Sequence, residues 1–78
     1  MKLRQFLNTC NTNTVDIEVY ASNDELLYEG TLYLIYHNHE DNNGKTLTET
    51  QRQQLLDSNV EAWELTNYES IAIYCDYR

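Results

Sequence analysis

The spacing of apolar residues changes several times along the chain, and each spacing predicts one element of secondary structure. Leu3, Phe6, Leu7 and Cys10 recur at intervals of three and four residues, which places them on one side of a helix. We therefore predict a short amphipathic helix over residues 2–10. The Asn- and Thr-rich sequence after it favours a turn.

Two strands are predicted after this helix. In residues 14–22, apolar side chains alternate with acidic and tyrosine side chains, as in a strand that is buried on one face. Residues 26–37 continue as a longer strand, and the intervening Ser-Asn-Asp-Glu sequence predicts the turn of a hairpin. Gly30 lies in the middle of the longer strand, which indicates a bulge or the close approach of another element.

A second helix is predicted over residues 46–59, where the apolar residues again follow a helical spacing. Its start has two candidate capping boxes, in which a Thr side chain and an acid or amide three residues later cap each other's backbone N–H groups. One pairs Thr46 with Glu49 and the other pairs Thr48 with Gln51. The sequence leaves both open.

Two short strands, over residues 60–65 and 71–77, complete the pattern. The predicted order is therefore α-β-β-α-β-β. Because short links between successive strands favour hairpins, we predict a four-stranded antiparallel sheet whose apolar face is covered by the two helices. The fold class is α+β, a small two-layer domain that comprises residues 1–78.

The charge of the chain narrows the choice of partner. The 78 residues include 13 acidic and 5 basic side chains, a net charge of -8. A domain this acidic is repelled by nucleic acids and by anionic membranes, so a partner chosen by charge must be basic. The alternative is that the acidic residues only keep a small protein soluble.

The two cysteines and the apolar segments indicate a cytoplasmic protein. Cys10 and Cys75 occupy predicted apolar positions far apart in the sequence, without the spacing of a metal or redox motif. No apolar run has the length of a signal peptide or a membrane span. We expect two buried, reduced thiols.

The loop over residues 37–45 carries the one sequence that suggests a metal. His37 and His39 could both contact zinc, but nearby acidic side chains would have to supply the remaining ligands. A calcium loop aligned on Gly44 has His39 as its first ligand and Thr50 in place of the required Glu. We interpret the segment as a solvated connection, and we predict no cofactor, no metal site and no catalytic residues.

The face of the sheet opposite the helices is the candidate binding surface. Tyrosines supply contact area there, and carboxylates beside them would select a basic partner. Trp63 is included as a candidate although either face fits the alternation. The other residues that the alternation places on this face are Asp16, Glu18, Tyr20, Glu29, Tyr33, Ile35, Tyr74 and Asp76.

The chain also resembles small hypothetical proteins of phages and prophages of Gram-positive bacteria. The resemblance follows the hydrophobic rhythm of "MKLRQFLN…TVDIEVYASNDELLYEGTLYLI…VEAWEL…SIAIYCDY" and centres on "ELLYEG", Glu25 to Gly30. It implies an accessory protein of a mobile element without catalytic residues. By size and charge alone, it is similar to anti-CRISPR inhibitors that occupy basic grooves of host nucleases. The expected function is therefore a non-enzymatic binding protein, with a self-associating homodimer as the alternative.

Overall fold

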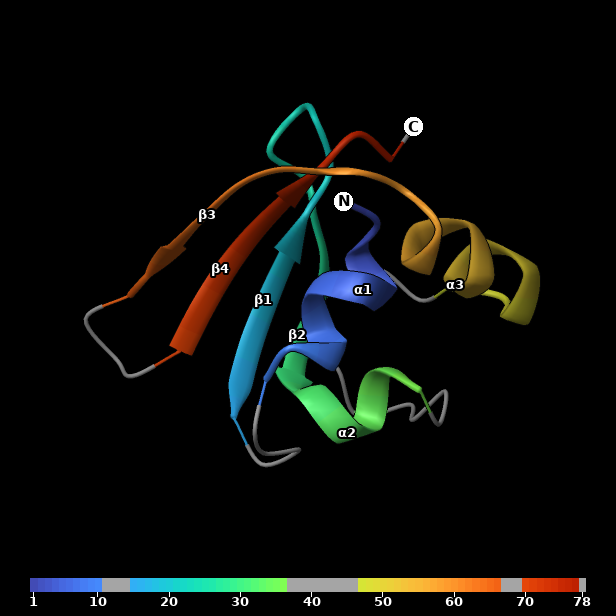
Figure 1. The fold of residues 1–78 in the computed structure, drawn as a ribbon. Coiled ribbons are helices and arrows are strands. Elements are labelled where there is room, and N and C mark those ends of the chain that lie inside the picture. Colours follow the sequence, from blue (N-terminus) through green and yellow to red (C-terminus); the bar gives the residue numbers. More distant parts are fainter. Residues whose placement is uncertain (11–14, 37–46, 67–69, 78) are drawn as a thin grey trace.

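The computed structural model of this protein describes residues 1–10, 15–36, 47–66 and 70–77 (Figure 1). The predicted first helix, first strand, second helix and last two strands are all present. A short additional helix, α2, makes the observed order α-β-β-α-α-β-β instead of the predicted α-β-β-α-β-β. The elements are α1 (Leu3–Asn8), β1 (Asp16–Tyr20), β2 (Leu26–Thr31), α2 (Leu32–Ile35), α3 (Glu49–Leu56), β3 (Val60–Leu65) and β4 (Ser70–Cys75).

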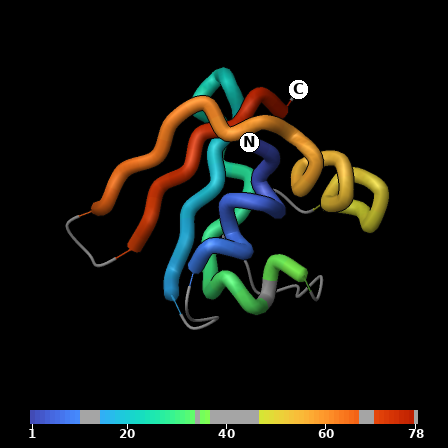
Figure 2. The backbone as a smooth tube through the Cα atoms, in the orientation of Figure 1, coloured from blue at the N-terminus to red at the C-terminus, as the bar shows by residue number. Residues whose placement is uncertain are grey.

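The four strands form one sheet in the order β2-β1-β4-β3. Both predicted hairpins are confirmed, because β1 pairs with β2 and β3 pairs with β4 in antiparallel fashion. The predicted all-antiparallel sheet is wrong, because the central strands β1 and β4 run parallel (Figure 2). The reason lies in the connection between the hairpins. It brings the chain back to the end of the sheet where β2 starts, so β3 runs in the same direction as β2, and β4 in the same direction as β1. The sheet is therefore mixed.

The predicted long strand over residues 26–37 is also wrong in its second half, because β2 ends at Thr31 and the chain turns into α2. Leu32 and Ile35 are both buried in the core. In a strand, residues three apart point to opposite faces, whereas in a helix they lie on the same side. The helical turn therefore buries two large apolar side chains where a strand would expose one of them.

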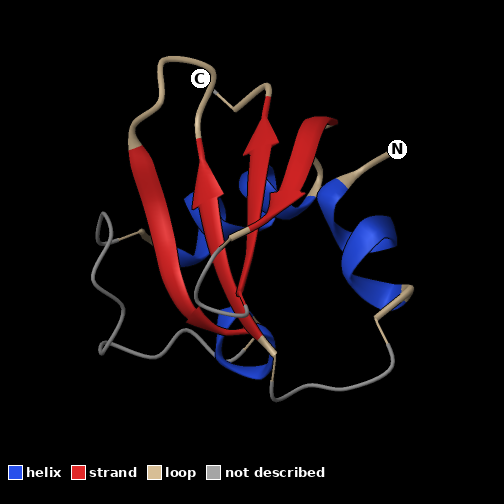
Figure 3. Cartoon of the chain, turned by 90° about the vertical axis from the view of Figure 1, so that its left-hand side faces the viewer, coloured by secondary structure: helices blue, strands red, loops and turns tan. Residues whose placement is uncertain are grey.

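The helices lie on one side of the sheet, and Figure 3 views the sheet from the other side. Large apolar side chains from the helices and from the facing side of the strands make up the core between the two layers. The most deeply buried are Leu3, Leu7, Ile17, Val19, Leu27, Ile35, Leu55, Leu56, Ile73 and Cys75. Among the described residues, no helix or strand covers the opposite face of the sheet, which we call the open face.

At the start of α3, the predicted capping box of Thr48 and Gln51 is present. The Thr48 hydroxyl accepts a hydrogen bond from the Gln51 N–H at 3.1 Å, and the Gln51 side chain accepts one from the Thr48 N–H at 2.9 Å. Arg52, one turn into the helix, is buried and donates to the Ile35 carbonyl at 3.1 Å. Because Ile35 ends α2, this hydrogen bond ties α3 to α2.

Candidate protein-binding site

Two tyrosines stack on the open face of the sheet, near the ends of its two central strands. The parallel register of β1 and β4 places Tyr20 beside Tyr74. Their ring centroids are 5.1 Å apart and the ring planes differ by 16°. Offset stacking of this kind holds both rings in a fixed orientation and presents a continuous aromatic surface.

Glu18 fixes one end of this stack. Its carboxylate accepts a hydrogen bond from the Tyr20 hydroxyl at 2.6 Å and another from the Ser70 hydroxyl at 3.3 Å. The hydrogen bond to Glu18, together with partial burial, raises the pKa of Tyr20 to about 12. Tyr20 is a neutral hydrogen-bond donor at physiological pH, and its hydrogen bond together with that of Ser70 holds the Glu18 carboxylate in place.

Carboxylates on three strands lie in one row beside the tyrosines. The register aligns Glu29 of β2 with Glu18 of β1, then Ala72 of β4, then Glu64 of β3. The Tyr74 hydroxyl donates to Glu64 at 3.3 Å, and burial together with the negative charge of Glu64 raises the pKa of Tyr74. The row of acids thus runs across the sheet next to the row of tyrosines.

We define the acidic tyrosine face by six residues that the register places on this surface. They are Asp16, Glu18, Tyr20, Glu29, Glu64 and Tyr74. The sequence analysis did not place Glu64 on this face, although the alternation over residues 60–65 sets Glu64 and Trp63 on different faces of the strand. Glu64 and Trp63 are adjacent in a strand, so they point to opposite faces.

Three residues predicted for this face occupy other places. Tyr33 lies on α2, beyond the end of β2, and the predicted Ile35 is buried in the core. Asp76 directly follows β4, and its carboxylate accepts hydrogen bonds from the Asn59 backbone N–H at 2.7 Å and from the Asn59 side chain at 3.4 Å, so it joins the residue before β3 to the residue after β4. The corrections for Tyr33 and Ile35 follow from the end of β2 at Thr31.

Trp63 is the third correction, because it lies on the helix side of the sheet. It pairs with Ile73, and its ring packs against Phe6 of α1 with centroids 5.7 Å apart. Trp63 nevertheless remains 55% exposed, and Leu65 on the same side is 73% exposed. The edge of the helix side therefore carries apolar side chains that the core does not cover.

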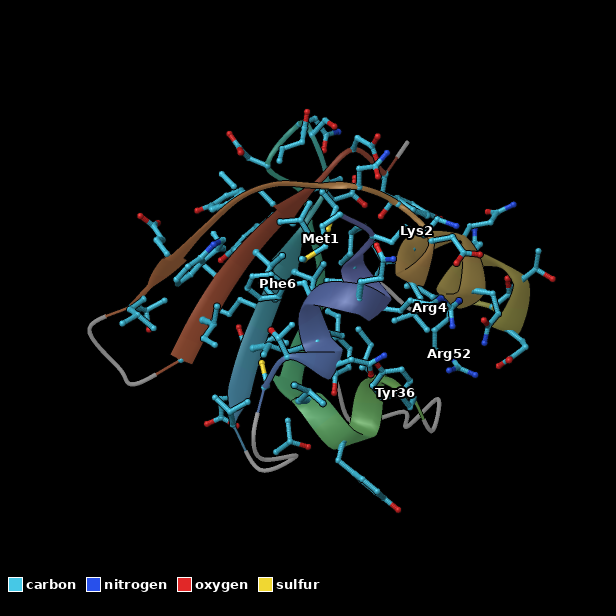
Figure 4. All side chains as sticks on the ribbon, in the orientation of Figure 1. Met1, Lys2, Arg4, Phe6, Tyr36 and Arg52 are labelled. Carbon is cyan, nitrogen blue, oxygen red and sulfur yellow. The ribbon has the colours of Figure 1, made fainter. Side chains whose placement is uncertain are left out.

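The described basic side chains lie away from the acidic tyrosine face. Lys2 precedes α1, Arg4 lies on α1 and Arg52 on α3 (Figure 4). Arg4 forms an ion pair with Asp57 at 2.8 Å, and Arg52 forms one with Glu49. The acidic residues of the open face are therefore not neutralised by these three cations.

The structure places the predicted thiols in different environments. Cys75 is fully buried and Cys10 is half-buried, and both are free. Burial raises the pKa of the Cys75 thiol to about 11. The thiol is therefore protonated at neutral pH and is a poor nucleophile.

Within residues 1–10, 15–36, 47–66 and 70–77, no group of three or more His, Cys, Asp and Glu side chains is arranged to hold a metal ion. The predicted loop with His37 and His39 lies outside these residues. No helix in the described part of the chain is long and apolar enough to cross a membrane. Comparisons with family models, curated proteins and solved structures found no match to this chain.

Proposed function

We propose that this protein is a non-enzymatic binding protein whose acidic tyrosine face covers a basic surface of a partner protein. The observation that carries the proposal is the arrangement of the Tyr20–Tyr74 stack beside the row of Glu29, Glu18 and Glu64. Aromatic residues supply most of the energy at the centres of interfaces, and carboxylates around them favour a partner of opposite charge.

The fixed geometry of the face supports this proposal. Tyr20, Glu18 and Ser70 are joined by hydrogen bonds before any partner arrives, so little side-chain entropy is lost on binding. A stable interface buries about 800 Å² on each partner. That area is roughly a sixth of the protein's total surface of 5044 Å².

We further propose that the partner is a protein that itself binds nucleic acid, such as a host nuclease. Such proteins carry basic grooves that attract phosphate groups, and an acidic surface of fixed shape can occupy the same groove. The resemblance to phage proteins favours this class of partner and a cytoplasmic location. The protein would then act as an inhibitor by excluding the nucleic acid.

The experiment starts with capture of partners from a host-cell lysate, followed by elution along a salt gradient. The captured protein is then purified, and its affinity is measured with two variants. One combines Tyr74→Ala with Glu64→Gln on the acidic tyrosine face. The matched control combines Tyr33→Ala with Gln54→Lys, so both variants lose one tyrosine and change the net charge from -8 to -7.

We expect the variant of the acidic tyrosine face to bind about thirty-fold more weakly, which corresponds to ~2 kcal/mol, whereas the control binds like the natural chain. Binding should also weaken as salt shortens the Debye length from about 10 Å at 0.1 M to about 3 Å at 1 M. Duplex DNA should compete if the partner's surface is a nucleic-acid groove. Equal affinities of the two variants would refute the proposed face.

Self-association is the rival function. Two copies meeting through this face would bring the row of carboxylates on each copy close together, which costs electrostatic energy. Sedimentation at increasing protein concentration separates the two cases. A dimer that the Tyr74→Ala, Glu64→Gln variant prevents would favour the rival.

A further inference from the structure

The outer edge of β3 has backbone groups available for an added strand. β3 is at one end of the strand order, so only its β4 side is paired within the sheet. The Thr66 N–H donates to the Ser70 carbonyl at 2.9 Å, which identifies Thr66 as a residue whose backbone points toward β4. Because this orientation alternates in an antiparallel pair, Trp63 and Leu65 direct their N–H and C=O groups outward.

The chain itself already adds a short extended segment to the start of this edge. The Val60 N–H donates to the Met1 carbonyl at 2.8 Å, and the Leu3 N–H donates to the Ser58 carbonyl at 2.8 Å. These bonds form an antiparallel bridge between Lys2 and Asn59. The bridge covers only the start of the edge, and no described segment continues it along residues 61–65.

The two sides of the free edge differ in chemistry. On the helix side, Trp63 and Leu65 are largely exposed, and Phe6 projects from α1 over the strands toward Trp63 (Figure 4). On the open side, Glu64 belongs to the acidic tyrosine face. An added strand would place every second side chain against the apolar group and the intervening ones beside the carboxylate.

Charge decides which kind of strand fits. If two copies paired antiparallel about Glu64, the carboxylates of the two Glu64 residues would lie directly opposite each other. The two chains would also approach each other with a net charge of -8 apiece. A strand with basic residues beside Glu64 is attracted instead. The edge is therefore better suited to a basic strand than to its own copy.

We propose that the free edge of β3 binds an extended segment of the partner in which basic residues alternate with bulky apolar ones. The basic residues would lie beside Glu64, and the apolar residues would pack on Trp63 and Leu65. Main-chain hydrogen bonds to Trp63 and Leu65 would hold the segment in register. This inference rests on the proposed function, because it names the part of a basic partner that reaches the edge of the acidic tyrosine face.

The test uses the fluorescence of Trp63, the only tryptophan in the chain. The probe is the capped peptide Lys-Val-Lys-Val-Lys-Val-Lys, and the control is a peptide of the same composition with four Lys followed by three Val. We expect the alternating peptide to shift the Trp63 emission in a saturable way. The block peptide should bind at least tenfold more weakly, because it cannot place its apolar and basic residues on separate sides.

Two variants separate strand pairing from side-chain contact. Leu65→Pro removes an outward N–H without breaking a bond to β4, whereas Leu65→Ala removes the side chain and keeps that N–H. We expect Leu65→Pro to bind the alternating peptide at least tenfold more weakly than Leu65→Ala does. Equal binding by the two variants would overturn strand addition.

The outcomes also separate this inference from the proposed function. If the peptide binds through the edge while the Tyr74→Ala, Glu64→Gln variant keeps its full affinity for the captured partner, strand addition at the edge stands, but the proposed function fails, and with it the assignment of the added strand to that partner. If that variant loses the partner but neither peptide shifts the Trp63 emission, the edge inference alone fails. A shift of the emission with protein concentration, without peptide, would overturn the inference in favour of a second copy.

Discussion

Adding one methyl group at Gly30 should destabilise the end of β2. A Cβ atom built on Gly30 would lie 2.9 Å from the hydroxyl oxygen of Tyr28 and 3.3 Å from the ring carbon that bears it. The Tyr28 ring is 5% exposed, and its hydroxyl donates to the Thr31 carbonyl at 2.6 Å. The ring therefore cannot move away without losing that hydrogen bond or disturbing the core.

The expected cost of Gly30→Ala follows from two opposing effects. Overpacking of a buried contact typically costs ~1–3 kcal/mol. Replacing Gly with Ala restricts the unfolded chain, which stabilises the folded protein by ~0.4–1 kcal/mol. We expect a net loss of about 1–2 kcal/mol in the free energy of unfolding. Urea titration should show a lower midpoint at an unchanged slope.

Tyr28→Phe provides the control for this mechanism. Alone, it removes the hydrogen bond to Thr31 and should cost ~0.5–1.5 kcal/mol. It also removes the hydroxyl oxygen that Gly30→Ala would meet at 2.9 Å. The double variant should therefore lose about 1 kcal/mol less than the sum of the two single losses. Additive losses, or a Gly30→Ala variant as stable as the natural chain, would refute the steric argument.

Two further predictions concern stability. Thr48→Ala removes the acceptor for the Gln51 N–H and should lower the free energy of unfolding by ~1 kcal/mol, whereas Thr50→Ala on the exposed first turn should cost little; urea titration compares them. Burial raises the pKa of the Cys75 thiol from 9.0 to about 11. The buried, neutral thiol therefore contributes fully to the free energy of unfolding below pH 9, and this contribution is lost at higher pH as the thiol of the unfolded chain ionises. Between pH 8 and 10.5, the natural chain should lose about 2 kcal/mol more stability than Cys75→Ala, and equal losses would show that the thiol is not the cause.

The elements with a clear repeat could be predicted from the sequence, and those governed by distant contacts could not. The alternation over β1 correctly separated buried Ile17 and Val19 from Glu18 and Tyr20. The turn after β1 was also predicted, and there Asp24 adopts a φ of 65°, a conformation that Asp tolerates better than most residues. Both features depend only on neighbours in the sequence.

The incorrect predictions share a different cause. A short apolar run such as residues 32–35 fits a strand or a helical turn equally well, and only the core decides which one buries Leu32 with Ile35. Likewise, Trp63 fits either face until the pairing of β3 with β4 is known. Gly30 was expected to mark a bulge or the close approach of another element, but the group close to it is the ring of Tyr28 from the same strand.

The direction of β4 relative to β1 connects the error in topology to the candidate site. In the observed parallel register, Asp16 lies beside Ser70, and Tyr20 lies beside Tyr74. In an antiparallel register over the same residues, Tyr20 would lie beside Ser70, and Tyr74 would lie beside Asp16. Four residues would then separate the two rings along the strand direction, which is about 13 Å at 3.3 Å per residue. The same residues on the same face would give two separate tyrosines and no stack. The sequence pattern therefore predicted most residues of the acidic tyrosine face. The stack of Tyr20 on Tyr74, however, depends on the connection between the two hairpins.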